Sequence, residues 1–142
     1  MTEPTVTTLD ERMDYAARRK KEMNCCQAVL VAFADKLGKG EDDLLRLGSG
    51  FGSGMGTMEG TCGALVGAIM VSSLLSAEGE ARNNSRAIMP RFKELCGGAT
   101  ICRDLKGIET GKMLCSCEDC VRNAVLAAME VLKDDAFASD VH

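Results

Sequence analysis

Four of the eight cysteines in this sequence share a setting that favours thiolate chemistry. Each is expected in the first turn of a helix that begins at or near Asn, Thr or Ser, the usual capping residues. These four are Cys25, Cys62, Cys102 and Cys117. Unpaired N–H groups at a helix start stabilise a thiolate by about 0.3–1 kcal/mol or more when partly buried. Thiolates bind soft metals and react with disulfides, although any single cysteine of this kind is equally often a small buried hydrophobic residue.

The other four cysteines give weaker signals. Cys26 is adjacent to Cys25, and because neighbouring helical residues point about 100° apart, one of the two can face the site while the other packs. Cys96 precedes a Gly-Gly stop and is left unassigned. Cys115 and Cys120 complete a C-x-C-x-x-C pattern around Cys117, in which the C-x-x-C resembles the pair of dithiol oxidoreductases. We therefore treat Cys115 and Cys120 as additional candidate metal ligands.

The residues next to each cysteine predict an order of reactivity. Cys117 is followed by Glu118 and Asp119, whose charges oppose a thiolate. Cys62 has no acidic neighbour and is followed by Gly63. We therefore expect Cys62 to be the most accessible and most easily ionised thiol, ahead of Cys117.

Histidine is too scarce for several common chemistries. The single histidine is His142, which excludes zinc sites with two histidines and makes Cys–His and Ser–His–Asp centres implausible. No C-x-x-C-H motif for covalent haem occurs. An all-thiolate site suits an iron–sulfur cluster or zinc, and the cysteine spacing does not match the common ferredoxin run. The cofactor stays unknown at this point.

Composition narrows the partners and the compartment. Seventeen basic and 21 acidic residues give a net charge of −4, and Trp is absent, so we expect no nucleic-acid binding. The longest nearly uncharged apolar stretch, residues 62–75, is too short to span a bilayer, so we expect no membrane insertion. The first residues lack the pattern of a signal peptide, and we expect a cytoplasmic protein. In that reducing compartment clustered cysteines favour metal or redox roles.

Hydrophobic spacing predicts an all-α fold: one domain, residues 1–142, forming a bundle of about five to six helices. Helices are expected to begin at the capping boxes Thr8–Glu11 and Asn24–Gln27, at Glu41, and at Thr61 as an N-cap. Gly38 should end the second helix. A linker is expected at residues 78–86, a helix at 86–96 with a boundary or kink near Pro90, and a last helix from Cys117 to Leu132.

Every second residue from Gly48 to Gly56 is glycine. The segment contains no nucleotide-binding pattern, so nucleotide binding is improbable. Its glycines fit a tightly packed loop with positive φ angles better than an anion-binding nest. A third interpretation is a loop that wraps a cofactor, with Gly54, Gly56 and Gly63 as the candidate contacts.

Several motifs in order resemble one family. They are Asn24-Cys25-x-Gln27-Ala-Val, Gly54-Met-Gly56, Cys62-Gly63-Ala64-x-x-Gly67, Cys102-Arg-x-Leu105 and Cys117-x-x-x-Val121. Over residues 24–132 the chain is similar to the C_GCAxxG_C_C family of redox-active proteins. Its four characteristic cysteines would fall on Cys25, Cys62, Cys102 and Cys117, the same four selected by their helix-start setting. The extra cysteines, and Glu118 where the family pattern suggests proline, depart from that resemblance.

The resemblance implies a small, mostly helical prokaryotic protein with a redox or cluster-binding role and no established substrate. Two hypotheses follow. In the first, the four cysteines converge to form either a dithiol/disulfide centre or an iron–sulfur site, so that the chain is a thiol/disulfide or electron-transfer oxidoreductase with an unknown redox partner. In the alternative, the protein is non-catalytic and holds a four-thiolate zinc ion. A homo-oligomer is compatible with both.

Overall fold

Helices account for all the regular secondary structure in the part of the chain that the computed structural model describes, residues 8–132. In chain order they are α1 (Leu9–Arg19), α2 (Cys25–Ala32), α3 (Ala34–Leu37), α4 (Glu41–Gly48), the irregular turn η1 (Gly54–Met58), α5 (Gly63–Leu75), α6 (Ala81–Leu95), α7 (Cys102–Lys106) and α8 (Cys117–Leu132). The prediction of an all-α bundle is confirmed, and six of these segments have seven residues or more.

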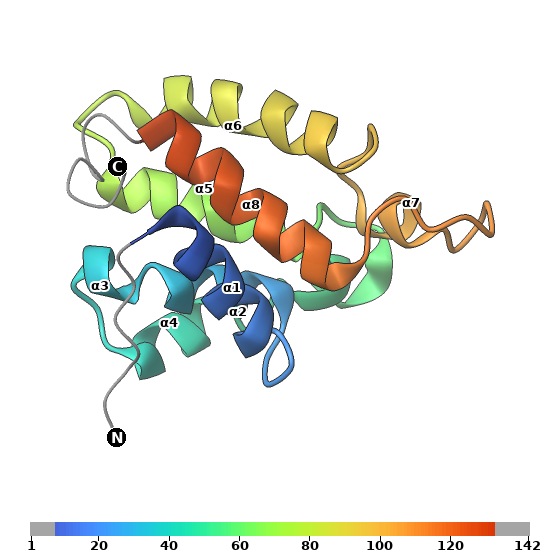
Figure 1. Ribbon diagram of the computed structural model, residues 1–142, viewed down its shortest axis with the longest axis horizontal. Coiled ribbons are helices and arrows are strands. Elements are labelled where there is room, and N and C mark those ends of the chain that lie inside the picture. Colours follow the sequence, from blue (N-terminus) through green and yellow to red (C-terminus); the bar gives the residue numbers. More distant parts are fainter. Residues whose placement is uncertain (1–7, 133–142) are drawn as a thin grey trace.

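The long apolar helix α5 is the centre of the bundle. Helices α2, α6 and α8 all pack against it, and α1 covers α8 and α2. Figure 1 shows α8 crossing the middle of the molecule, with α6 along one side and α1 to α4 along the other. The turn η1, α7 and the first turn of α8 gather at one end of the bundle, so chain segments far apart in sequence meet there (Figure 1).

Both predicted capping boxes are present. Asn24 accepts a 2.8 Å hydrogen bond from the backbone N–H of Gln27, and the Gln27 side chain accepts one of 3.0 Å from the N–H of Asn24. The Asn24 amide also donates to the Gly48 carbonyl at 3.2 Å. The two hydrogen bonds of the capping box fix Cys25 as the first residue of α2. The hydrogen bond to Gly48 connects that helix start to the glycine-rich segment.

Two helix boundaries differ from the sequence prediction. Thr61 is not the N-cap of α5, because it forms an isolated β-bridge with Ile101, and Cys62 occupies the N-cap position. The predicted second helix also breaks at Phe33, which separates α2 from the short α3. Gly38, with φ of 67°, ends α3 as predicted.

The expected linker at residues 78–86 and the expected helix boundary at Pro90 were wrong. Helix α6 begins at Ala81, inside the expected linker, and continues without a boundary through Pro90 to Leu95. A proline inside a helix costs about 3 kcal/mol, but burying Ile88 and Phe92 contributes about 1.5–3 kcal/mol each. Tertiary packing therefore outweighs the local preference. Gly97, with φ of 89°, follows the end of α6 as the sequence predicted.

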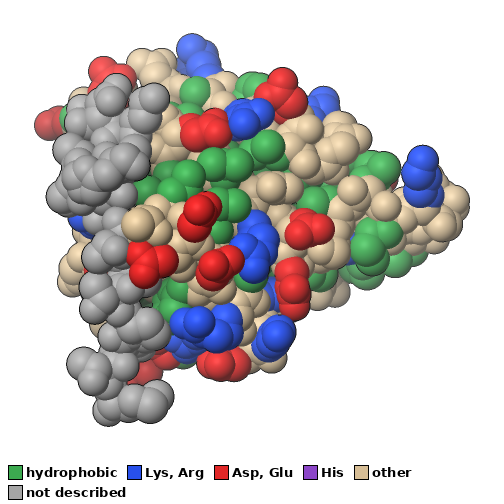
Figure 2. Space-filling model, viewed as in Figure 1, with side chains coloured by type: hydrophobic (Ala, Val, Ile, Leu, Met, Phe, Trp, Pro, Cys, Tyr) green, Lys and Arg blue, Asp and Glu red, His purple; other side chains and the backbone are tan. Residues whose placement is uncertain are grey.

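The surface carries a mixed distribution of charge. On the face in Figure 2, basic and acidic side chains are interspersed among apolar ones. None of the helices within residues 8–132 combines the length and the apolar character that crossing a bilayer requires.

Candidate functional site

The four cysteines singled out from the sequence line one pocket, with a volume of about 110 Å³. Cys25 is the first residue of α2, Cys102 of α7 and Cys117 of α8, while Cys62 is the N-cap of α5. The complete lining consists of Lys20, Asn24, Cys25, Ser53, Met58, Cys62, Gly63, Cys102, Lys106 and Cys117. Four helix starts therefore face one hollow, which we call the cysteine pocket.

A short backbone pairing joins two of these helix starts. The N–H of Cys62 donates to the Thr100 carbonyl at 2.8 Å, and the N–H of Cys102 donates to the Gly60 carbonyl at 3.0 Å. These two bonds surround the Thr61–Ile101 bridge. They hold Cys62 and Cys102 side by side although about 40 residues separate them along the chain.

The glycine-rich segment closes tightly against the cysteine pocket. Gly54 has φ of 59°, and a Cβ atom there would lie 2.7 Å from the Cβ of Cys102. A Cβ at Gly63 would lie 2.6 Å from the Phe51 carbonyl oxygen. Gly56 differs, since nothing lies within 4 Å of its Cβ position. The candidate glycines Gly54 and Gly63 thus adjoin the cysteines, while Gly56 is needed only for its φ of 81°.

Backbone strain is concentrated in the same segment. Ser53 and Met58, which both line the pocket, have φ angles of 52° and 65°. Such conformations cost about 1–3 kcal/mol each in residues other than glycine and persist where surrounding structure enforces them. Strain of this kind is typical of functional sites.

Cys25 and Cys117 form an unequal pair. The Cys25 thiol donates to the Cys117 sulfur, which lowers the pKa of Cys117 to about 5 against the opposing effect of its burial. The ammonium groups of Lys106 and Lys20 lower it further. The same hydrogen bond, together with burial, raises the pKa of Cys25. Near neutral pH, Cys117 therefore carries the negative charge and Cys25 keeps its proton.

The structure favours the reverse of the expected order of accessibility and ionisation for Cys62 and Cys117. Cys62 is 2% exposed, whereas Cys117 is half-buried. The contact with the Cys120 sulfur, followed by burial, raises the pKa of Cys62, although the N–H groups of Ala64 and Leu65 oppose that shift. Glu118 and Asp119, the expected obstacles at Cys117, are exposed, so water screens their charges. Sequence neighbours therefore mattered less than contacts from other helices.

Of the two adjacent cysteines, Cys26 is the one that packs in the core, while Cys25 lines the pocket. It is fully buried, with its sulfur 4.0 Å from that of Met70. Burial, and then the nearby Cys62, raise its pKa to about 12. The adjacent cysteines 25 and 26 thus belong to different environments.

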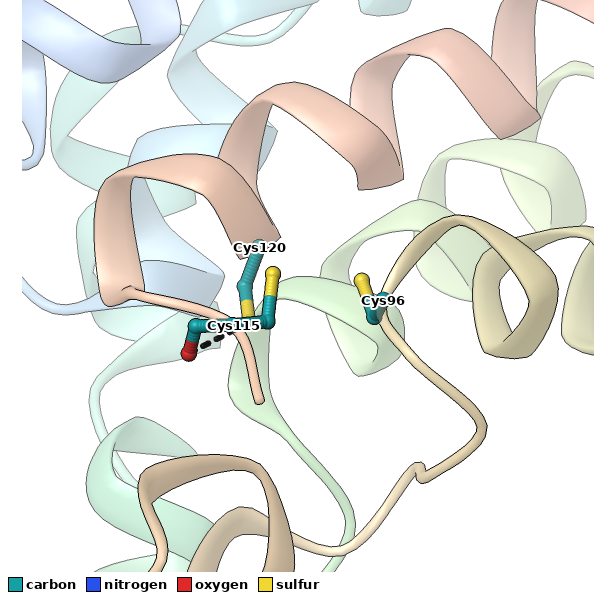
Figure 3. A group of neighbouring side chains, drawn as sticks. All are labelled: Cys96, Cys115 and Cys120. Atoms are coloured by element: carbon teal, nitrogen blue, oxygen red, sulfur yellow. Dashed lines mark hydrogen bonds between the residues drawn. The ribbon is translucent and has the colours of Figure 1, made fainter. Parts of the chain in front are cut away.

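A second group of thiols lies beside the cysteine pocket. The sulfur atoms of Cys96, Cys115 and Cys120 all lie within 4.8 Å of one another (Figure 3). We call this group the thiol trio. The C-x-C-x-x-C pattern indicated Cys115 and Cys120 as candidate ligands, but nothing in the sequence paired them with Cys96. No local signal pointed to that meeting, because it depends on segments that lie far apart in the sequence.

Comparison with known families agrees with the motifs. The family described as "Putative redox-active protein (C_GCAxxG_C_C)" matches residues 23–131. The chain belongs to this family. No curated protein and no solved structure gives a match. The sequence resemblance is thus confirmed over most of the chain.

In this C_GCAxxG_C_C protein, the distances between sulfur atoms bear on which metal ion the cysteine pocket and the thiol trio can bind. Zn–S bonds of about 2.3 Å place the sulfur atoms of a tetrahedral zinc site about 3.8 Å apart. Within residues 8–132, the trio is the one set of three or more cysteine, histidine or acidic ligands that all lie within 4.8 Å of one another. The pocket cysteines Cys25, Cys62, Cys102 and Cys117 do not form such a set.

Proposed function

We propose that this C_GCAxxG_C_C protein is an electron-transfer protein whose cysteine pocket holds an iron–sulfur cluster. Cys25, Cys62, Cys102 and Cys117 would be its ligands. The observation that carries this proposal is that all four cysteines, from four different helix starts, line the same small hollow. Four cysteine thiolates are the usual ligands of both two-iron and four-iron clusters.

The pocket cysteines do not form a set of ligands that all lie within 4.8 Å of one another, which supports a cluster over a single ion. A cluster distributes its four thiolates over at least two iron atoms, so its ligands stand further apart than those of tetrahedral zinc. This counts against the alternative of a four-thiolate zinc site in the pocket.

The charges around the pocket also suit a cluster. Four thiolates give the cluster a net negative charge, and Lys20 and Lys106 supply opposite charge at the pocket wall. Net charge and hydrogen bonding to the sulfur atoms set the reduction potential of such a centre. These lysines therefore favour the reduced, more negative state.

A cluster bound there would supply one-electron chemistry, in which one electron passes from a reduced carrier to an oxidised acceptor without a change in any covalent bond. Cys25, Cys62, Cys102 and Cys117 would hold the cluster, and Lys20 and Lys106 would supply the opposite charge. We propose that this exchange takes place in the reducing cytoplasm, where thiolate ligands stay unoxidised.

A second candidate function rests on the unequal pair of Cys25 and Cys117. The Cys117 thiolate attacks a substrate disulfide, forms a mixed disulfide and releases one substrate thiolate. Cys25 then loses its proton and attacks the Cys117 sulfur, releasing the second thiol and leaving a Cys25–Cys117 disulfide. Two electrons pass from the protein to the substrate. The low pKa of Cys117, about 5, favours this chemistry in metal-free protein.

Anaerobic purification separates these functions. Iron, acid-labile sulfide and zinc are measured on the same sample, and its visible absorption is recorded. We expect iron with sulfide and a broad visible band, abolished by Cys102→Ser and retained by Cys26→Ala. Metal-free protein that forms a reversible Cys25–Cys117 disulfide would support the second candidate instead, and zinc without sulfide would contradict both.

A further inference from the structure

The thiol trio has the composition of a metal site that is separate from the cysteine pocket. Cys96 follows the end of α6, Cys115 lies in the loop before α8, and Cys120 lies in the first turns of α8. Figure 3 shows the three side chains directed toward one another from these segments. Their sulfur atoms all lie within 4.8 Å of one another. No disulfide joins the described cysteines, so all three sulfur atoms are free to bind a metal.

Each sulfur atom of the trio receives an N–H donor. The Asn123 amide lies 3.4 Å from the Cys96 sulfur and 3.7 Å from the Cys115 sulfur. Lys106 donates to the Cys120 sulfur at 3.4 Å and to the Cys115 carbonyl at 2.9 Å. Hydrogen bonds of this kind orient and stabilise metal-bound thiolates, and the ammonium group adds a compensating positive charge.

The number of thiols in the trio bears on the ion that it suits. Cys96, Cys115 and Cys120 are 1%, 7% and 0% exposed, so the site is closed to bulk solvent. Structural zinc sites are almost always four-coordinate. Among residues 8–132 no fourth cysteine, histidine or carboxylate ligand lies within 4.8 Å of all three sulfur atoms, and three buried thiolates match a soft ion that accepts low coordination numbers, such as Cu⁺.

The geometry points to a second metal site in which Cys96, Cys115 and Cys120 bind one soft monovalent ion of the Cu⁺ type, with Asn123 and Lys106 holding the thiolates. Binding replaces the thiol protons with the metal ion, and no electron is transferred. The site adjoins the cysteine pocket, because Cys120 contacts Cys62 and Lys106 lines the pocket as well.

The test uses Cu⁺ as the probe, added without oxygen in the presence of a competing chelator. In the full chain carrying Cys25→Ser and Cys117→Ser, the cysteine pocket has lost two ligands while the trio is intact. We expect this variant to bind one Cu⁺ with three sulfur neighbours, as measured by X-ray absorption. Adding Cys96→Ser should remove that ion, and Cys26→Ala should leave it in place.

Asn123→Leu tests the donor role, because it removes the amide while nearly keeping side-chain volume. We expect the Cu⁺ affinity to fall about 10- to 100-fold, as is typical when a hydrogen-bond partner of a metal ligand is removed. Circular dichroism verifies that each variant folds. If the double variant does not fold, Cys96→Ser in the otherwise unchanged chain should lower the Cu⁺ stoichiometry by one.

Three outcomes would overturn the proposal. They are unchanged Cu⁺ binding in Cys96→Ser, no Cu⁺ binding in a folded double variant, and tighter binding of Zn²⁺ with four sulfur neighbours that requires Cys62. Iron and sulfide analysis of untreated protein and of its Cys102→Ser variant reports on the cysteine pocket. Failure of the copper site is therefore distinguishable from failure of the proposed electron-transfer function.

Discussion

The cysteine pocket and the thiol trio use the same residue type in opposite environments. The pocket lies among four helix starts and is lined by Lys20, Lys106 and strained glycine-rich backbone. The trio is closed, fully buried and held by N–H donors from one amide and one ammonium group. Lys106 contacts both groups, and the contact between Cys62 and Cys120 joins them.

Cys115 and Cys117, only two positions apart, show how the two environments change the pKa of a cysteine. Cys117, in the pocket, has its pKa lowered to about 5 by the hydrogen bond from Cys25 and by two lysines. Cys115, in the trio, has its pKa raised to about 12 by burial and then by the adjacent Cys120. The chemistry of a cysteine here is set by the segments that fold against it, since the local sequence of the two is nearly shared.

The largest expected effect comes from exchanging these two residues for serine. Cys117→Ser removes a proposed cluster ligand and should abolish the iron and sulfide content. Cys115→Ser changes the trio and should leave both contents close to those of the unchanged protein. Metal analysis of anaerobically purified variants measures this, and equal losses in the two variants would mean that the groups do not function separately.

The next largest effect is expected from comparing alanine substitutions at Gly54 and Gly56. Gly54→Ala and Gly56→Ala both place a side chain on a positive φ angle, at a cost of about 1–2 kcal/mol each. Only the new methyl group at 54 meets Cys102. Gly54→Ala should therefore lose the metal centre as well as stability.

Thermal unfolding combined with iron analysis distinguishes the two glycine effects. Gly56→Ala serves as the control for strain alone, and it should keep its iron. Retention of full iron content by Gly54→Ala would show that the close approach to Cys102 has no role in the centre.

Alkylation of reduced, metal-free protein compares the thiols directly. The lowered pKa of Cys117 means that its thiolate persists at neutral pH and is lost only as the pH falls through about 5. Labelling of Cys117 should be fast and nearly constant above about pH 6. Cys25 and Cys62, whose pKa values are raised, should react slowly and accelerate only in alkaline solution. Peptide mapping at several pH values measures this, and faster labelling of Cys62 would refute the assignment.

The smallest expected effect is the difference between substitutions of Lys106 and Lys20 in the rate of Cys117 labelling. Lys106 and Lys20 both lower the pKa of Cys117, with Lys106 the stronger of the two. Lys106→Met should slow Cys117 labelling near pH 5 by roughly threefold, and Lys20→Met by less. No effect of Lys106→Met on the labelling of Cys117 would indicate that Lys106 acts only on the trio.

Local signals were sufficient to predict the two capping boxes and to select the four pocket cysteines. The capping boxes at Thr8 and Asn24 depend on residues three positions apart, and both form as predicted. The helix-start setting likewise needs only a few neighbouring residues. It selected four cysteines that long-range packing then brings around one pocket.

The features that could not be predicted from the sequence depend on contacts between segments that lie far apart in the chain. Thr61 pairs with Ile101, so Cys62 takes the N-cap position instead. Cys96 meets Cys115 and Cys120 only because the chain turns after α6 and returns beside α8. The lowered pKa of Cys117 was missed for the same reason, because Cys25 and Lys106 reach Cys117 from other helices.

Anomalous X-ray scattering at the iron absorption edge, on crystals grown without oxygen, tests the central claim most directly. The account predicts an iron signal within bonding distance of the sulfur atoms of Cys25, Cys62, Cys102 and Cys117. An iron signal at the thiol trio, or anaerobic crystals of this protein without iron in the cysteine pocket, would contradict it.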